Sequence, residues 1–131
     1  MNLIYTCSYS HTNKVSRTFG DIESKRKDLG GIKGVIVPTP EITTFPFTPN
    51  TDYALLACDG VFDVLTNEEV NEIIWETVDY YKNNKKGGKG TGDLLGMCLN
   101  DCVNNVLKRS LIQNSEDNVT IILVAFRNFL E

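Results

Sequence analysis

The chain has 131 residues, of which 41% are hydrophobic and 23% charged, so we expect one globular domain rather than a disordered or fibrous protein. Thirteen Lys and Arg residues stand against seventeen Asp and Glu residues, and the net charge of −4 argues against nucleic acid or an anionic membrane as a partner. A cation, such as a metal ion, is the better electrostatic match.

Two further features concern the cellular compartment. No apolar stretch reaches the length of about 18 residues that a membrane span requires, and the first residues do not have the pattern of a secretion signal. The four cysteines form no CxxC pair, and the one histidine is His11. We therefore expect an intracellular protein, cytoplasmic or nuclear, with reduced core thiols; zinc binding and a disulfide are the alternatives.

The first third of the chain has few signals of regular structure. SRTFGD at residues 16–21 leads into KRKDLGG at 25–31, a charged segment ending in two glycines, where we expect a loop. Residues 35–37 favour a strand, but Pro38 and Pro40 lack the backbone donors that the interior of a sheet needs. This segment is expected to be an edge strand or an extended connector.

A strand and an amphipathic helix are predicted next. Residues 53–58 form a short apolar run without alternation, which predicts a strand covered on both faces. Thr66 and Glu69 have the spacing of a capping box, so a helix should begin there. Apolar residues at helical spacing over 70–81 predict that this helix continues to about residue 82 with one face toward a core.

A polar segment separates this helix from a second one. Residues 82–92, KNNKKGGKGTG, contain no apolar side chain and predict a flexible loop rich in lysine and glycine. A phosphate-binding loop is the alternative, but no apolar strand leads into the segment and it contains no GK[ST] motif. A helix is then predicted over about 93–110, with Cys98 and Cys102 one turn apart on its apolar face as core residues rather than a metal site.

The two predicted strands each have a carboxylate at one end. Asp59 follows the strand at 53–58, and Asp117 precedes a β-branched run at 119–126 that predicts a second buried strand. If the two strands are adjacent and antiparallel, both carboxylates emerge at the same end of the sheet. A divalent cation would neutralise their mutual repulsion, and hard oxygen ligands favour Mg²⁺ or Mn²⁺ over Zn²⁺.

The residues next to these aspartates allow two interpretations. Gly60 would permit a sharp turn close to an ion, and Asn118 could order the second loop by hydrogen bonding. Asp-Gly and Asp-Asn are also common turn dipeptides without any metal. Taken alone, these residues leave both an ordinary turn and a metal site open.

Four motifs in order, SRTFGD, VPTPEI, YALLACDGVFDVLTNEEV and SEDNVTIILVAF, resemble the C-terminal half of the catalytic domain of the metal-dependent type 2C Ser/Thr protein phosphatases, the PPM family. The corresponding stretches of that family read like SRAFGD, an extended segment with P-E-I, LASDGLWDV and S-x-DN-x-T. The resemblance implies an α+β fold over residues 1–131 that is part of an antiparallel β-sandwich flanked by helices, incomplete on its N-terminal side.

Carried over by position, the resemblance implies that Asp59 and Asp117 are ligands of a Mg²⁺ or Mn²⁺ site. In that family, two metal ions activate a water that hydrolyses phosphoserine or phosphothreonine in protein substrates, without a phosphoenzyme. Gly60, Asp63 and Asn118 are then expected near the site, with Asp63 organising the loop and Asn118 orienting Asp117.

The SRTFGD motif matches a family element that lies near the active site, and its matching residues are Ser16, Arg17, Gly20 and Asp21. The phosphate-binding arginine of the family belongs to its first half. Arg17 is therefore expected to form a structural ion pair with a neighbouring acid rather than to bind phosphate.

Several motifs of the family have no counterpart in the sequence. The Asp-Gly-His-Gly motif, an upstream arginine-and-glutamate element and a Gly-Asp-Ser-Arg segment are missing. In the family they supply a bridging aspartate, a glycine carbonyl ligand and the phosphate-binding arginine, so only part of the metal site is expected here. Strands that lack their neighbours leave unpaired edges, and we expect self-association or local rearrangement.

Two hypotheses about function follow, from different classes. The first is a Mg²⁺- or Mn²⁺-dependent protein Ser/Thr phosphatase, a hydrolase acting on phosphoproteins and present here as a partial catalytic domain. The alternative is a catalytically inactive, phosphatase-like module that binds a protein partner. A receiver-like domain that accepts phosphate on Asp59 is disfavoured, because the chain has no repeated βα units.

Overall fold

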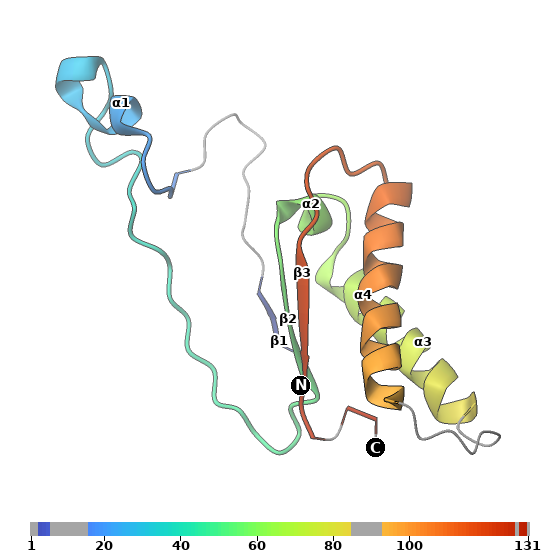
Figure 1. The fold of residues 1–131 in the computed structure, drawn as a ribbon. Helices are drawn as coiled ribbons and strands as arrows, with labels where there is room; N and C mark the ends of the chain where they lie inside the picture. Colours follow the sequence, from blue (N-terminus) through green and yellow to red (C-terminus); the bar gives the residue numbers. More distant parts are fainter. Residues whose placement is uncertain (1–2, 6–15, 85–92, 128, 131) are drawn as a thin grey trace. The chain divides into compact units, whose positions relative to one another are not determined.

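The computed structural model describes residues 3–5, 16–84, 93–127 and 129–130 (Figure 1). The chain forms two compact units. The sheet unit comprises Met1–Ser8 and Phe47–Glu131, and the loop unit comprises Tyr9–Pro46. None of the helices in the described ranges is both long enough and apolar enough to cross a membrane.

A three-stranded sheet organises the sheet unit. Its strands are β1 (Leu3–Tyr5), β2 (Tyr53–Ala57) and β3 (Ile121–Ala125), in the spatial order β1-β2-β3. β2 and β3 are antiparallel, as predicted, with Ala57 opposite Ile121. β1 pairs with β2 in the parallel direction, which the sequence did not indicate. The α+β class is therefore confirmed, and β2 is the central strand, with one antiparallel and one parallel neighbour.

Two long helices, α3 (Asn67–Asn84) and α4 (Leu94–Ile112), pack together and cover one face of the sheet (Figure 1). The core between them and the sheet contains aliphatic, aromatic and thiol side chains. Its fully buried members include Tyr53, Leu55, Ile74, Val78, Cys98, Cys102, Val106 and Phe129. Burial raises the pKa of the Cys102 thiol to about 12, so this cysteine stays protonated as a core residue.

The opposite face of the sheet is exposed in part, which corrects the predicted burial of the two strands: Ala54 on that face is buried, as predicted, but three other side chains are open to solvent. Leu56, Ile122 and Val124 are 43%, 56% and 43% exposed. Successive side chains of a strand point to opposite faces, and α3 and α4 cover only one of the two. The remaining apolar side chains therefore form an open apolar sheet face, defined here by these three residues.

The start of α3 is the predicted capping box. The Glu69 amide donates to Thr66 Oγ1 at 3.2 Å, and the Thr66 amide donates to Glu69 Oε2 at 2.8 Å. The bond from the Thr66 amide lowers the pKa of the Glu69 carboxyl. The two bonds satisfy amides that the first turn of a helix leaves unpaired.

The end of α3 differs from the expected loop at 82–92. The helix continues to Asn84, because Asn84 Nδ2 donates to the Tyr80 carbonyl at 2.8 Å and Lys82 Nζ lies 5.6 Å from the centre of the Trp75 ring. Both contacts use polar side chains to extend the helix beyond its apolar stripe. The remainder of the predicted loop, residues 85–92, lies outside the described residues.

The helix α4 lies between Asp93 and Asn114. It is two residues longer at its C-terminal end than predicted. Asp93 Oδ1 accepts from the Gly96 amide at 2.8 Å, as an N-cap does. Asn114, with φ 61°, takes the left-handed conformation just beyond the helix. The Ser115 amide then bonds to the Ser110 carbonyl at 3.0 Å, and the chain turns toward Asp117.

The loop unit contains α1 (Ile22–Lys25) and the 3₁₀ turn η1 (Lys27–Leu29), where the sequence predicted a loop. Lys25 Nζ donates to the carbonyls of Thr18 and Gly20 at 2.6 and 2.5 Å, which closes the turn. Residues 35–37 make only isolated bridges, so the extended connector, rather than an edge strand, is the observed alternative.

Candidate metal centre

The antiparallel pairing of β2 and β3 brings Asp59 and Asp117 to the same end of the sheet. β2 ends at Ala57, directly opposite Ile121, where β3 begins. Asp59 follows Ala57 by two residues, and Asp117 precedes Ile121 by four. Figure 1 shows α2 (Asp59–Phe62) and the segment leading into β3 at this end. The predicted placement of the two aspartates is therefore confirmed.

Both aspartates have the same local hydrogen bond. Asp59 Oδ1 accepts from the amide of the next residue, Gly60, at 3.1 Å. Asp117 Oδ1 likewise accepts from the amide of Asn118 at 2.6 Å. Each bond fixes one oxygen of the carboxylate against the backbone. Among the described residues, neither aspartate accepts a hydrogen bond on its second oxygen.

Gly60 allows the two segments to approach each other closely. It is buried, and a Cβ at this position would lie 2.4 Å from the carbonyl oxygen of Asn118. No side chain larger than hydrogen fits unless the two backbones separate. Gly60 thus permits backbone packing between the Asp59 turn and the Asp117 loop, whereas its predicted closeness to an ion stays a prediction.

Asn118 and Asp63 act through their backbones in the described structure. The group that contacts the Asp117 carboxylate is the backbone amide of Asn118, rather than its side chain. The Asp63 amide donates to the Asp59 carbonyl at 2.8 Å and ends α2. The Asp63 side chain is exposed and has no hydrogen-bond partner among the described residues, so its predicted role as organiser of the loop stays a prediction.

Arg17 forms the predicted structural ion pair. Arg17 Nη2 lies 2.9 Å from Glu41 Oε1, and Arg17 Nη1 donates to the Thr39 carbonyl at 2.7 Å. The amide of Val37 donates to the Ser16 carbonyl at 3.0 Å. These contacts join SRTFGD to VPTPEI within the loop unit.

Gly20 and Asp21 form a turn in the same unit. Both have positive φ, 72° and 47°, and Asp21 Oδ1 accepts from Ser24 Oγ at 2.9 Å. The loop unit is a compact body of its own, separate from the sheet unit that contains Asp59. The nearness of Ser16, Gly20 and Asp21 to the metal centre stays a prediction.

The carboxylate oxygens of Asp59 and Asp117 suit a hard divalent cation as ligands, but two carboxylates do not complete its coordination. Carboxylate oxygens are preferred ligands of Mg²⁺ and Mn²⁺, and Mg²⁺ usually retains several waters. Within the described ranges, no group of three or more His, Cys, Asp or Glu side chains could hold an ion. The roles of Asp59 and Asp117 as metal ligands therefore stay a prediction.

Comparison with known proteins identifies the family. A sequence model of the family described as Protein phosphatase 2C matches residues 9–119. The chain therefore belongs to the protein phosphatase 2C family, as the order of the four motifs predicted.

Individual relatives support the same assignment. Protein phosphatase 1B of Mus musculus is 30% identical over 115 residues, which cover 87% of this chain and 26% of the relative. Integrin-linked kinase-associated serine/threonine phosphatase 2C of Bos taurus is 34% identical over 111 residues, covering 85% and 27%. Probable protein phosphatase 2C 60 of Arabidopsis thaliana is 29% identical over 120 residues, covering 87% and 29%. The chain thus spans less than a third of the length of each of these relatives.

Sequence reasoning missed two residues of this centre. Cys58 was expected in the core, but it is half-buried and its thiol contacts the Asp117 loop. Ser115 was noted only as the first letter of a motif, yet its hydroxyl donates to the Gly60 carbonyl at 2.6 Å. Only their positions in the sequence could have indicated a role near the aspartates, because both lie within two residues of one.

Proposed function

We propose that the chain contributes part of the active site of a Mg²⁺- or Mn²⁺-dependent protein Ser/Thr phosphatase that hydrolyses phosphoserine or phosphothreonine in protein substrates. The observation that carries the proposal is the placement of Asp59 and Asp117 at one end of an antiparallel strand pair in a member of the protein phosphatase 2C family. The relatives named as phosphatases support the reaction type.

The proposed roles follow from the chemistry of the two carboxylates. A bound divalent cation would lower the pKa of a coordinated water and polarise a phosphoryl oxygen. Asp59 and Asp117 would hold the cation through the oxygens that face away from their backbone amides. Gly60 keeps the two segments in backbone contact, so the carboxylates are presented together rather than on independent loops.

Hydrolysis of a phosphothreonine peptide across a Mn²⁺ titration tests the proposal. Turnover should depend on the metal, and Asp59→Asn should abolish it. Asp79→Asn is the matched control, because it removes an exposed carboxylate on α3 rather than on either segment that carries the two aspartates. Turnover that survives in Asp59→Asn, or that is lost equally in Asp79→Asn, would contradict the roles given to the ligands.

A specific observation favours the second candidate, a phosphatase-like module that binds a protein partner or a second copy of itself. The open apolar sheet face exposes Leu56, Ile122 and Val124 side by side on paired strands. Exposed apolar side chains grouped on one face are typical of a surface that another protein covers. A chain that shows no hydrolysis at any Mn²⁺ concentration but associates through this face would support this candidate.

A further inference from the structure

One residue beyond the last β2–β3 pair, one of the two backbone hydrogen bonds expected between the strands is replaced. The Cys58 amide donates to the Thr120 carbonyl at 3.2 Å, which continues the antiparallel pattern. The reciprocal bond would run from the Thr120 amide to the Cys58 carbonyl. That carbonyl instead accepts from the Val61 amide at 3.2 Å, where α2 begins. The turn that presents Asp59 therefore takes away the acceptor that the Thr120 amide would use.

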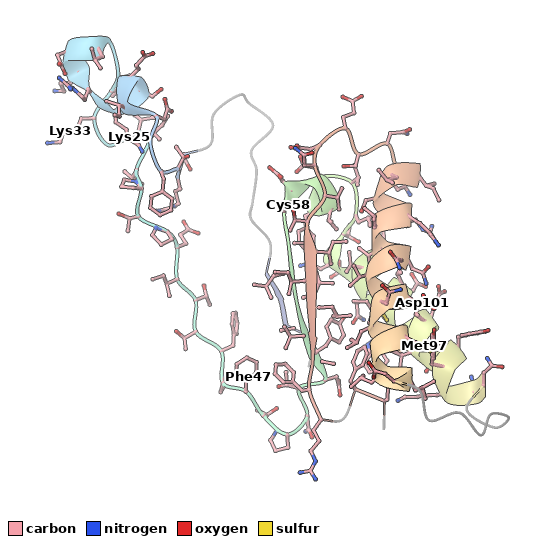
Figure 2. The ribbon with its side chains drawn as sticks, in the orientation of Figure 1. Lys25, Lys33, Phe47, Cys58, Met97 and Asp101 are labelled. Atoms are coloured by element: carbon pink, nitrogen blue, oxygen red, sulfur yellow. The ribbon has the colours of Figure 1, made fainter. Side chains whose placement is uncertain are left out.

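The Cys58 thiol replaces that acceptor. The Thr120 amide donates to Cys58 Sγ at 3.2 Å, and Cys58 Sγ donates to the Asn118 carbonyl at 3.1 Å. A thiol is both a weak donor and a weak acceptor, and here both capacities are used. Figure 2 shows Cys58 where β2 gives way to α2. The side chain directly before Asp59 is thus hydrogen-bonded to the residue directly after Asp117.

A second link lies on the other side of the two aspartates. Ser115 Oγ donates to the Gly60 carbonyl at 2.6 Å. Gly60 follows Asp59 directly, and Ser115 precedes Asp117 by two residues. The Cys58 link therefore joins the residue before Asp59 to the residue after Asp117. The Ser115 link joins the residue after Asp59 to a residue that precedes Asp117.

We propose that the Cys58 thiol and the Ser115 hydroxyl are positioning groups that hold the Asp59 turn and the Asp117 loop at a fixed separation for a shared divalent cation. The inference rests on the proposed function, because it takes the two aspartates as the ligands. Two carboxylates near each other repel, and two exposed loops without cross-links would move apart before an ion arrives. Groups that fix the ligands in advance raise the affinity for the metal.

The test measures Mn²⁺ affinity by electron paramagnetic resonance, together with thermal unfolding in the absence of metal, for the full chain and its variants. We expect Cys58→Ala and Ser115→Ala each to weaken Mn²⁺ binding by about tenfold or more, as loss of an outer-shell partner typically does. Cys58→Ser should stay within about threefold of wild type, because a hydroxyl also donates and accepts. If Cys58→Ala does not unfold cooperatively, Cys58→Val, which fills the space without a hydrogen-bonding group, takes its place.

Ser110→Ala is the matched control for a merely structural effect. Ser110 Oγ donates to the Val106 carbonyl at 3.0 Å inside α4, so this variant loses a comparable bond elsewhere in the sheet unit. It should lower the unfolding temperature and leave Mn²⁺ affinity unchanged. If Cys58→Ala and Ser115→Ala behave in the same way, the positioning role is overturned.

Failure of the proposed function has a different signature. Unchanged Mn²⁺ affinity in Asp59→Asn, or no measurable binding by wild type, would overturn the metal centre itself and this inference with it. A loss of affinity in Asp59→Asn together with wild-type affinity in Cys58→Ala and Ser115→Ala would overturn the positioning role alone.

Discussion

Asn114 has a left-handed backbone conformation where α4 ends and the chain turns toward the Asp117 loop. Asparagine tolerates this conformation better than most residues, and glycine adopts it without steric cost. We predict that Asn114→Val destabilises the fold by about 1–2 kcal/mol, whereas Asn114→Gly leaves it close to wild type. Urea unfolding measures both variants. Equal stability of the valine and glycine variants would contradict the conformation described here.

Single residues also show where sequence reasoning stops. Asp59 and Asp117 were predicted as neighbours, because strand ends and residue types are visible in the sequence. The links made by Cys58 and Ser115 were not, because they depend on which carbonyl the first turn of α2 occupies. The sequence does not distinguish a half-buried cysteine from a core cysteine, and only the tertiary structure shows that Cys58 is half-buried whereas Cys102 is buried.

Among the secondary-structure elements, α3 depends on the Thr66–Glu69 capping box. The lowered pKa of Glu69 in the folded state means that its charged form stabilises the fold. That contribution is complete above the ordinary pKa of glutamate, and it is lost as the pH falls through the lowered pKa. We predict that Glu69→Gln makes stability less dependent on pH in this acidic range.

Urea unfolding of wild type and Glu69→Gln over about pH 3 to 7, a range that includes the ordinary glutamate pKa, checks this prediction. Glu72→Gln, a change of the same kind at an exposed position of α3 outside the capping box, is the control. Identical pH profiles of the two glutamine variants would contradict the role given to the Glu69 carboxylate.

The buried face of α3 gives a second prediction at this scale. Ile74 is fully buried in the core, whereas Ile112 at the end of α4 is 72% exposed. We predict that Ile74→Ala costs about 2–5 kcal/mol of stability, as truncation of a packed core side chain does. Ile112→Ala should cost far less, because little of the side chain is withdrawn from water. Chemical denaturation of the pair checks the assignment of faces, and a similar loss in both would refute it.

The elements differ in how well the sequence predicts them. Both long helices were predicted, because helical spacing and caps are local signals, although α3 extends to Asn84 through contacts that periodicity does not register. The strands were found but their burial was overestimated. A continuous apolar run such as residues 53–58 shows that both faces suit a core, and it does not show what covers each face.

For the whole molecule, the open apolar sheet face predicts self-association. β3 is at the edge of the described sheet, and Ile122 on it is 56% exposed. Exposed apolar edge strands tend to pair with other chains, and a lysine on such an edge opposes pairing. We predict that the average mass of wild type rises with concentration in analytical ultracentrifugation and that Ile122→Lys suppresses this rise.

Ile112→Lys is the control for that prediction, because it places the same charge on an exposed isoleucine of α4 outside the sheet face. It should leave the association unchanged. A wild-type chain that stays monomeric at every concentration would contradict the prediction, as would equal suppression by both lysine variants.

The central claim is that Asp59 and Asp117 together hold a divalent cation at the end of the β2–β3 pair, and a Mn²⁺ titration followed by electron paramagnetic resonance tests it most directly. Asp59→Asn and Asp117→Asn should each reduce Mn²⁺ affinity by at least about tenfold, since even the loss of an outer-shell partner costs that much. Asp79→Asn, which removes an exposed carboxylate of α3, should bind like wild type. The same affinity in all four proteins would contradict the claim.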